Sequence, residues 1–239
     1  MGLIDAIRSY VDQFVELFSQ FDVPAAFWVT LQLTFFAGVG SLVLGTLLAL
    51  LRISPVPSLR WAGTSYVNVL RNTPLTVIIL FCNLGLFVQL GVTLSSPTSP
   101  TFFVDNNFRL AVLGLTVYHA AFVCEAVRSG VNTVPTGQAE AARAIGLAFL
   151  PTVRIVILPQ AFRGAVAPLG NTLIALTKNS TVASAIGVAE ASSLMRTLIE
   201  FRPDVIVAVF LTFAAGFVVL VLPVGLLITS LSRRLAVSR

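Results

Sequence analysis

Apolar stretches long enough to cross a lipid bilayer fill most of this chain. A transmembrane α-helix needs about 20 consecutive, predominantly apolar residues. Runs of about that length cover 26–51, 64–90, 108–127, 155–176 and 205–231. Only 10% of the residues are charged, whereas soluble domains carry about 25%. We therefore predict an all-α integral membrane protein with about five transmembrane helices, forming one domain over residues 1–239.

The first 22 residues differ from these spans. Ile4, Ile7, Val11 and Phe14 share one helical face, and acidic and basic side chains occupy the rest. This pattern predicts an amphipathic helix lying at the membrane interface rather than a cleaved signal peptide.

Basic residues between the spans predict how the chain is oriented. One set of loops and the C-terminus carry Arg52, Arg60, Arg128, Arg143, Arg154, Arg163, Arg233, Arg234 and Arg239. The opposite loops carry Arg8, Arg109, Arg196 and Arg202, each near acidic residues. Loops rich in Lys and Arg stay in the cytoplasm. We expect a cytoplasmic C-terminus and, with five spans, an N-terminus outside.

A loop that contains several polar residues covers 138–160. Ala141, Ala144, Ile145, Ala148 and Phe149 recur on one helical face. Gly146 weakens such a helix, and Pro151 ends or bends it. We expect a short amphipathic helix, a kink and a return into apolar sequence, with its surface offered to a partner.

Polar groups inside the spans are costly and indicate a functional surface. An arginine such as Arg71 costs roughly 3 kcal/mol within a span, so it needs a water-filled cavity, a partner, or a position near the interface. The fourth span contains Pro159, Pro168, Gly170 and Asn171. We expect these residues to interrupt its helix, which is tolerated where a span lines a cavity or packs on protein.

Other chemistry-bearing residues have simpler interpretations. Glu125 and Arg128 are spaced to pair on one helix face. His119 has no ligand partner at metal-binding spacing, and Cys82 and Cys124 are expected to be small core residues. The chain has no phosphate-binding G-x-x-x-x-G-K-[ST] motif. The sequence also has no basic stripe with interleaved aromatic residues, so we expect no nucleic-acid partner. From the isolated His119 and the lack of a nucleophile–base combination we expect no metal and no enzymatic activity.

One long pattern resembles a known family. Glu140-Ala141-Ala142, Gly146 and Val156-Ile157-Leu158-Pro159 are similar to the EAA loop of ATP-binding-cassette (ABC) importer permeases, with Val156 in place of the usual Ile. The resemblance implies the type I importer permease fold, with a cytoplasmic coupling loop over 133–163 that docks on an ATPase subunit. The coupling residues that it implies are Glu140, Ala141, Ala142, Arg143, Gly146, Leu158 and Pro159.

Further motifs resemble the permeases of polar amino acids, especially actinobacterial glutamate uptake systems. They include Thr30–Thr34, Arg71–Leu75 and Leu158–Arg163. The resemblance implies a multi-pass subunit of a bacterial cell membrane that works by alternating access. Its implied partners are ABC ATPase subunits that bind ATP and Mg, a second and paralogous permease, and an extracellular substrate-binding protein.

Glutamate carries two carboxylates and one ammonium, so its passage requires positive charge and hydrogen-bond donors. The residues we expect along its path are Asn68, Arg71, Thr73, Asn171, Lys178 and Asn179. Lys178 is equally interpreted as the anchor of a helix end. The alternatives are import of glutamine, aspartate or another polar amino acid, an ion-gradient carrier with Glu125 and His119 as proton relay, and an intramembrane enzyme or scaffold.

Overall fold

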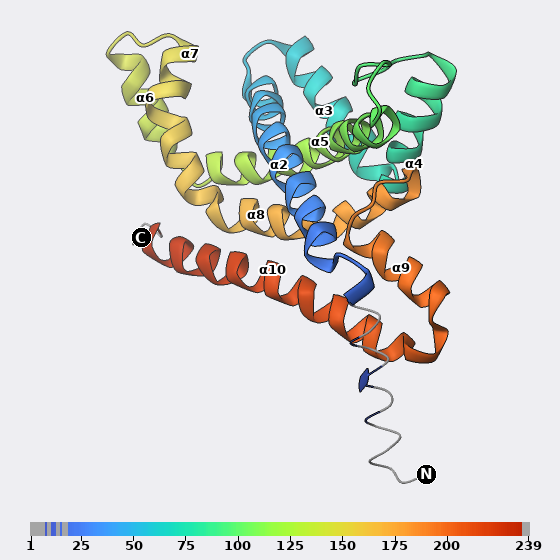
Figure 1. Cartoon of the computed structure of the whole chain (residues 1–239). Coiled ribbons are helices and arrows are strands. Elements are labelled where there is room, and N and C mark those ends of the chain that lie inside the picture. Colours follow the sequence, from blue (N-terminus) through green and yellow to red (C-terminus); the bar gives the residue numbers. More distant parts are fainter. Residues whose placement is uncertain (1–7, 9–10, 13–14, 16–18, 236–239) are drawn as a thin grey trace. The chain divides into compact units, whose positions relative to one another are not determined.

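The computed structural model describes residues 8, 11, 12, 15 and 19–235, and within them the chain is helical (Figure 1). The elements are α2 Val23–Ile53, α3 Pro57–Asn72, α4 Leu75–Leu80, η1 Phe81–Gln89, α5 Phe102–Val131, α6 Thr136–Ala144, α7 Phe149–Pro151, η2 Thr152–Ile157, α8 Leu158–Asn179, η3 Ser180–Ile186, α9 Ala191–Phe201, η4 Pro203–Val205 and α10 Ile206–Leu235. The all-α prediction is confirmed. The amphipathic helix predicted for residues 1–22 lies largely outside the described residues.

Four helical stretches are long and apolar enough to cross a membrane: Val23–Ile53, Phe102–Val131, Phe149–Ile186 and Pro203–Arg234. A fifth span exists only if α3 and the stretch Leu75–Gln89 are taken together. The break falls at Thr73, whose backbone is extended because Pro74 disfavours helical geometry in the preceding residue. The stretch predicted as the second span, 64–90, is thus divided between two helices that meet at an angle of 103°.

The fourth span is more continuous than the sequence predicted. We expected Pro159, Pro168, Gly170 and Asn171 to interrupt it, but α8 continues through all four positions. Pro159 falls in the first turn, where proline is tolerated. Gly170 serves packing, since a Cβ atom there would lie 2.3 Å from the Ile228 side chain of α10.

The described contacts divide the chain into two compact units. The first comprises the chain up to Phe36, Thr76–Gly114 and Thr177–Val221, and the second comprises Ala37–Leu75, Leu115–Leu176 and the chain from Leu222 onward. Helices α2, α5, α8 and α10 each contribute one end to each unit. The assignment of 1–239 to a single domain stays a prediction.

The core of the first unit forms where α9 and the start of α10 pack together. Its buried residues are Ala191, Leu198, Val205, Val209 and Phe213. Phe27 of α2 stacks on Phe213 with ring centroids 5.7 Å apart. Thr30, one turn further along α2, accepts the Ala191 N–H through its hydroxyl at 3.2 Å. The start of α9 is thus hydrogen-bonded to α2.

A buried carboxylate fixes the beginning of α9. Glu190 has no exposed surface, and it caps the helix by accepting the N–H groups of Ser192 at 2.8 Å and Ser193 at 2.9 Å. The Ser192 hydroxyl donates a third bond, of 2.6 Å. Burial raises the pKa of Glu190 above its ordinary value, and the serine donors oppose this effect without cancelling it.

We predict that Glu190→Ala destabilises the protein by about 1–2 kcal/mol, because the cap is lost. Glu190→Gln keeps an acceptor and removes the buried charge. A raised folded pKa means that the stabilising contribution of the carboxyl is complete below its unfolded pKa and is lost as pH rises through the folded value. Thermal unfolding in detergent should therefore show wild type losing stability relative to Glu190→Gln as pH increases from about 4. Parallel pH profiles would contradict this prediction.

The second unit is held by close approach of helix backbones. Its core contains Leu48, Ala49, Val67, Ala120, Ala121, Val123, Cys124 and Val127. Where α5 meets α8, a Cβ atom on Gly130 would lie only 2.0 Å from the Ala161 carbonyl oxygen. Small residues allow helices in lipid to approach this closely.

We predict that Gly130→Ala destabilises the protein by about 3 kcal/mol or more, because the added methyl meets backbone that cannot move aside. Gly225→Ala in α10 is the matched control, since its nearest neighbour, Ile174, is at an ordinary 3.7 Å. Thermal midpoints of the two purified variants test the difference. Equal midpoints would contradict this prediction, because they would show that the α5 and α8 backbones can separate at Gly130 at little cost.

Candidate functional site

The polar loop that interrupts the apolar chain begins with α6, which ends in a Schellman motif at Gly146. The Leu147 N–H bonds to the Ala142 carbonyl at 3.1 Å, and the Gly146 N–H bonds to the Arg143 carbonyl at 2.9 Å. Gly146 has φ +87°, a left-handed conformation that glycine adopts at little cost. The spacing from Glu140-Ala141-Ala142 to Gly146 is thus that of one short helix and its end.

The chain then turns into a second helical stretch. Pro151 lies in its first turn, so it does not end a helix as we expected. The Thr152 hydroxyl donates to the Leu147 carbonyl at 3.3 Å, and η2 packs against α6. The predicted kink exists, but Gly146 produces it.

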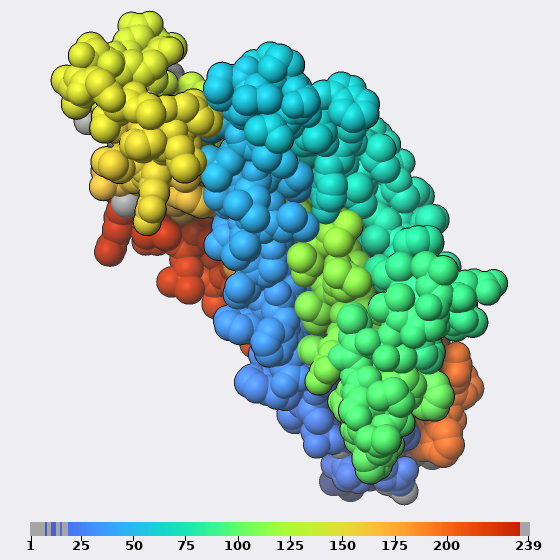
Figure 2. All heavy atoms as spheres, turned by 90° about the horizontal axis from the view of Figure 1, so that it is seen from above, coloured from blue at the N-terminus to red at the C-terminus, as the bar shows by residue number. Residues whose placement is uncertain are grey.

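This segment presents an apolar surface outward. The five residues of the predicted apolar face, Ala141, Ala144, Ile145, Ala148 and Phe149, are all exposed. Ile145 has 79% of its surface exposed, and Leu150 and Ile155 have similar exposure. Figure 2 shows the atoms of this segment, in yellow, gathered in one group.

The predicted coupling residues divide between this surface and the support beneath it. Glu140, Ala141, Arg143, Gly146 and Pro159 are exposed. Ala142 is buried, and Leu158 packs against the core of the second unit. The segment therefore connects an exposed apolar surface directly to the spans.

We predict that Gly146→Ala destabilises this loop by about 1–2 kcal/mol, because a side chain is strained at a left-handed backbone. Gly137→Ala is the matched control, since Gly137 lies in α6, also has open space around it and has no positive φ. Hydrogen exchange of the α6 amides should increase in the first variant and stay equal or decrease in the second. The opposite order would contradict the role given to Gly146.

The residues predicted along a substrate path start on α3. Asn68, Arg71 and Asn72 are all exposed and lie at positions i, i+3 and i+4, so they share one face of the helix. The Asn72 amide donates to the Asn68 carbonyl at 2.7 Å. Thr73, at the end of the helix, donates to the Val69 carbonyl at 2.8 Å. A polar face on a span requires water or protein beside it.

Arg71 reaches from this face to a cluster of charges in the second unit. The Glu125 carboxylate of α5 forms ion pairs with the guanidiniums of Arg52 at 2.5 Å, Arg71 at 3.6 Å and Arg128 at 3.5 Å. The predicted Glu125–Arg128 pair is therefore present, but sequence reasoning missed Arg52 and the contact with Arg71. The sequence did carry a signal. Glu125 is the only carboxylate within the five predicted spans, Arg71 lies within the second span, and Arg52 directly follows the first.

The other predicted path residues lie elsewhere. Asn171 is exposed on α8 within the second unit, whereas Lys178 and Asn179 end α8 within the first unit. The structure therefore brings together Asn68, Arg71 and Thr73, and describes no single cluster of all six.

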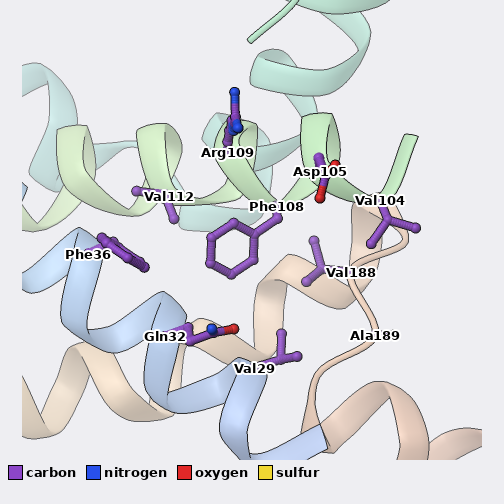
Figure 3. Close-up of a pocket in the computed structure, with 10 residues that line it drawn as sticks. All are labelled: Val29, Gln32, Phe36, Val104, Asp105, Phe108, Arg109, Val112, Val188 and Ala189. Atoms are coloured by element: carbon purple, nitrogen blue, oxygen red, sulfur yellow. The ribbon is translucent and has the colours of Figure 1, made fainter. Parts of the chain in front are cut away.

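Two hollows are lined by described residues of the first unit. One, of about 590 Å³, is lined by Val29, Gln32, Phe36, Val104, Asp105, Phe108, Arg109, Val112, Val188 and Ala189. Figure 3 shows Gln32 among apolar side chains and Arg109 directed away from Phe108. The Arg109 guanidinium donates to the Leu94 carbonyl, and Asp105 accepts the Thr101 hydroxyl at 2.6 Å. This hollow is a poor site for a carboxylate.

The second hollow, of about 540 Å³, has both apolar and polar residues in its lining. Thr76, Thr181, Ser184, Ser192 and Arg196 contribute to its lining. Thr181 follows Lys178 and Asn179 by one turn, so this hollow adjoins the predicted path residues at the end of α8. Sequence reasoning did not identify it, because its lining comes from four separate segments.

Residues considered for other chemistry are buried. His119 has 1% of its surface exposed, and its Nδ1 is 3.0 Å from the Leu115 carbonyl. Cys82 and Cys124 are free and buried, as predicted. Over the described part of the chain, no group of three or more His, Cys, Asp or Glu is placed to hold a metal ion.

Comparison with known proteins identifies the class. Residues 14–237 match the family model "Binding-protein-dependent transport system inner membrane component". The chain belongs to this family and is a permease subunit of an ABC importer. It is not the ATP-hydrolysing subunit, and membership in this family does not favour an ion-gradient carrier.

Individual relatives refine this result. The chain is 56% identical over 214 residues to the glutamate transport system permease protein GluC of Corynebacterium glutamicum, covering 90% of this chain and 94% of that protein. It is 34% identical to the probable glutamine ABC transporter permease protein GlnM of Bacillus subtilis, covering 87% and 91%. A solved amino acid ABC transporter, determined with histidines, matches with TM-score 0.74 and 27% identity, covering 98% of this chain and 99% of that one.

Proposed function

We propose that this chain is the permease subunit of an importer that moves glutamate into a bacterial cell. The main support for glutamate as the substrate is the 56% identity to a glutamate permease over 90% of the chain. The exposed polar face of α3 supports it, since Arg71 offers positive charge to an anionic substrate on a helix that belongs to a span.

The charge distribution supports an orientation. The second unit contains Glu125 and Glu140 as its only carboxylates in sequence, against ten arginines. The positive-inside rule places such a region on the cytoplasmic side. We infer a multi-pass protein of the bacterial cell membrane with its C-terminus in the cytoplasm and its N-terminus outside.

The exposed loop is suited to dock on a partner. Ile145, Leu150 and Ile155 form an apolar surface flanked by Glu140 and Arg143, and a span continues directly from it. We infer that this surface binds an ABC ATPase subunit, which holds ATP and Mg and closes on ATP. Closure moves the loop and shifts the equilibrium between outward-open and inward-open states. A second, paralogous permease and an extracellular binding protein complete the assembly.

The substrate path that we propose uses the six residues predicted from the sequence. Arg71, Asn68 and Thr73 provide donors at the break between α3 and α4, and Asn171 lies on α8. Lys178 and Asn179 adjoin the hollow that includes Thr181 and Arg196. Positive charge and donors replace the hydration of the glutamate carboxylates.

The test is ATP-dependent uptake of radiolabelled glutamate into proteoliposomes containing the complete importer and its binding protein. We predict uptake that requires ATP and is reduced by roughly tenfold or more in Arg71→Ala and Lys178→Ala, because a hydrogen bond to a charged group contributes about 1.5–3 kcal/mol. Glu140→Lys should abolish uptake by disrupting the docking surface. Glu200→Lys on α9 makes the same charge change outside the loop and should leave uptake near wild type.

Three other outcomes are informative. Import of another amino acid would reject glutamate and retain the importer. Normal uptake by both alanine variants at normal expression would reject the path residues. Uptake driven by an ion gradient in the absence of an ATPase would overturn the proposal.

A further inference from the structure

The cluster around Glu125 carries more positive charge than its carboxylate neutralises. Three guanidiniums, of Arg52, Arg71 and Arg128, lie within 3.6 Å of one carboxylate, so the cluster has a net charge of +2. Glu140, the other carboxylate in the second unit, is exposed on α6. Surplus charge on spans is costly unless water or an anion compensates it.

The three arginines are not held equally. Arg52 is the most buried, with 10% of its side chain exposed, and makes the shortest contact, at 2.5 Å to Oε1 of Glu125. Arg71 lies 3.6 Å from the same oxygen, and its side chain is 47% exposed. Its guanidinium also lies over the Phe122 ring, 5.7 Å from the centroid. The Phe122 ring therefore helps to position Arg71, which remains open on one side.

We propose that Arg71 and Glu125 form a carboxylate-exchange site, in which a carboxylate of the transported amino acid replaces Glu125 as the partner of Arg71. This inference rests on the proposed function and adds the Glu125 carboxylate as a competitor of the substrate for Arg71. Glu125 retains Arg52 and Arg128 when Arg71 leaves, so the exchange exposes no uncompensated carboxylate. The incoming carboxylate also lowers the net charge of the cluster from +2 to +1.

The exchange has a consequence for affinity. A transport site must bind its substrate well enough to admit it and weakly enough to release it. Glu125 competes with the substrate for Arg71 and thereby keeps binding weak. Removing the negative charge of Glu125 should tighten binding, whereas removing the positive charge of Arg71 should weaken it.

The experiment measures glutamate binding to the complete importer in nanodiscs, without binding protein, from the rise in melting temperature with ligand concentration. We expect Arg71→Gln to weaken binding by about tenfold or more and Arg71→Lys to weaken it less, because lysine keeps the charge and loses the planar fork. Glu125→Gln should tighten binding several-fold, and Glu125→Asp should stay near wild type. Arg60→Gln is the control, since Arg60 lies on α3 outside the cluster and contacts the Ser54 carbonyl.

Two neutralised ligands identify which carboxylate binds. Glutamine lacks the side-chain carboxylate, and isoglutamine lacks the α-carboxylate. Both ligands retain the ammonium group. The ligand whose binding is insensitive to Arg71→Gln has lost the carboxylate that Arg71 binds. Equal sensitivity of both ligands to Arg71→Gln would overturn assignment to one carboxylate at this site.

Opposite responses of the Arg71→Gln and Glu125→Gln variants would support exchange, whereas weakened binding in both would indicate that the ion pair only maintains the fold. If these variants do not assemble, Arg71→Lys decides, because binding like that of Arg60→Gln would overturn the proposal. A result that contradicts the exchange is distinguishable from one that contradicts the proposed function. Normal glutamate uptake with unaltered binding in the variants rejects the exchange and the place of Arg71 in the substrate path, but leaves the glutamate importer standing. Transport of another amino acid rejects only the substrate.

Discussion

Hydrocarbon offers no partner to a peptide N–H or C=O, and the described structure depends on this constraint. It explains why the apolar stretches are helical and why irregular backbone is confined to a few positions. At each of these positions a side chain or a glycine provides the missing bond or conformation. Thr73 ends α3, Gly146 closes α6, and Glu190 begins α9.

The exposed apolar surface of the loop, which we propose as the coupling surface, and the charge cluster around Glu125 both lie in the second unit. Leu158, which continues from the loop, and Val127, which lies between Glu125 and Arg128 in sequence, both belong to the packing around the core of the second unit. The tight α5–α8 contact at Gly130 lies between these features in sequence and joins the two helices that carry them. Displacement of the loop is therefore expected to reach the helix that bears Glu125. This arrangement gives a physical basis for linking a docking surface to a binding site.

Local sequence determined much of the fold but not its long-range contacts. Length and hydropathy were enough to locate most of the spans, because these features depend on neighbouring residues. A kink in the loop was also predicted, but it was assigned to Pro151, whereas the left-handed Gly146 produces it. The break at Thr73 was missed, although Pro74 follows it directly and Arg71 and Asn72 precede it. Continuity of α8 was missed because Gly170 was interpreted through its flexibility, whereas its role depends on Ile228, which is distant in sequence. The contacts of Glu125 with Arg52 and Arg71 likewise required the packing of three helices.

The Glu125 cluster also constrains the order in which the chain is assembled. Arg52 is synthesised 73 residues before Glu125, an interval of about 4–15 s at ordinary translation rates. During that interval, neither Arg52 nor Arg71 has its eventual carboxylate partner, and both retain the unneutralised charge that resists translocation. In the orientation that we propose, the same side chains serve first as topological signals and later as structural contacts. Because Glu125 is synthesised after Arg52 and Arg71, these two arginines can serve in both roles in succession.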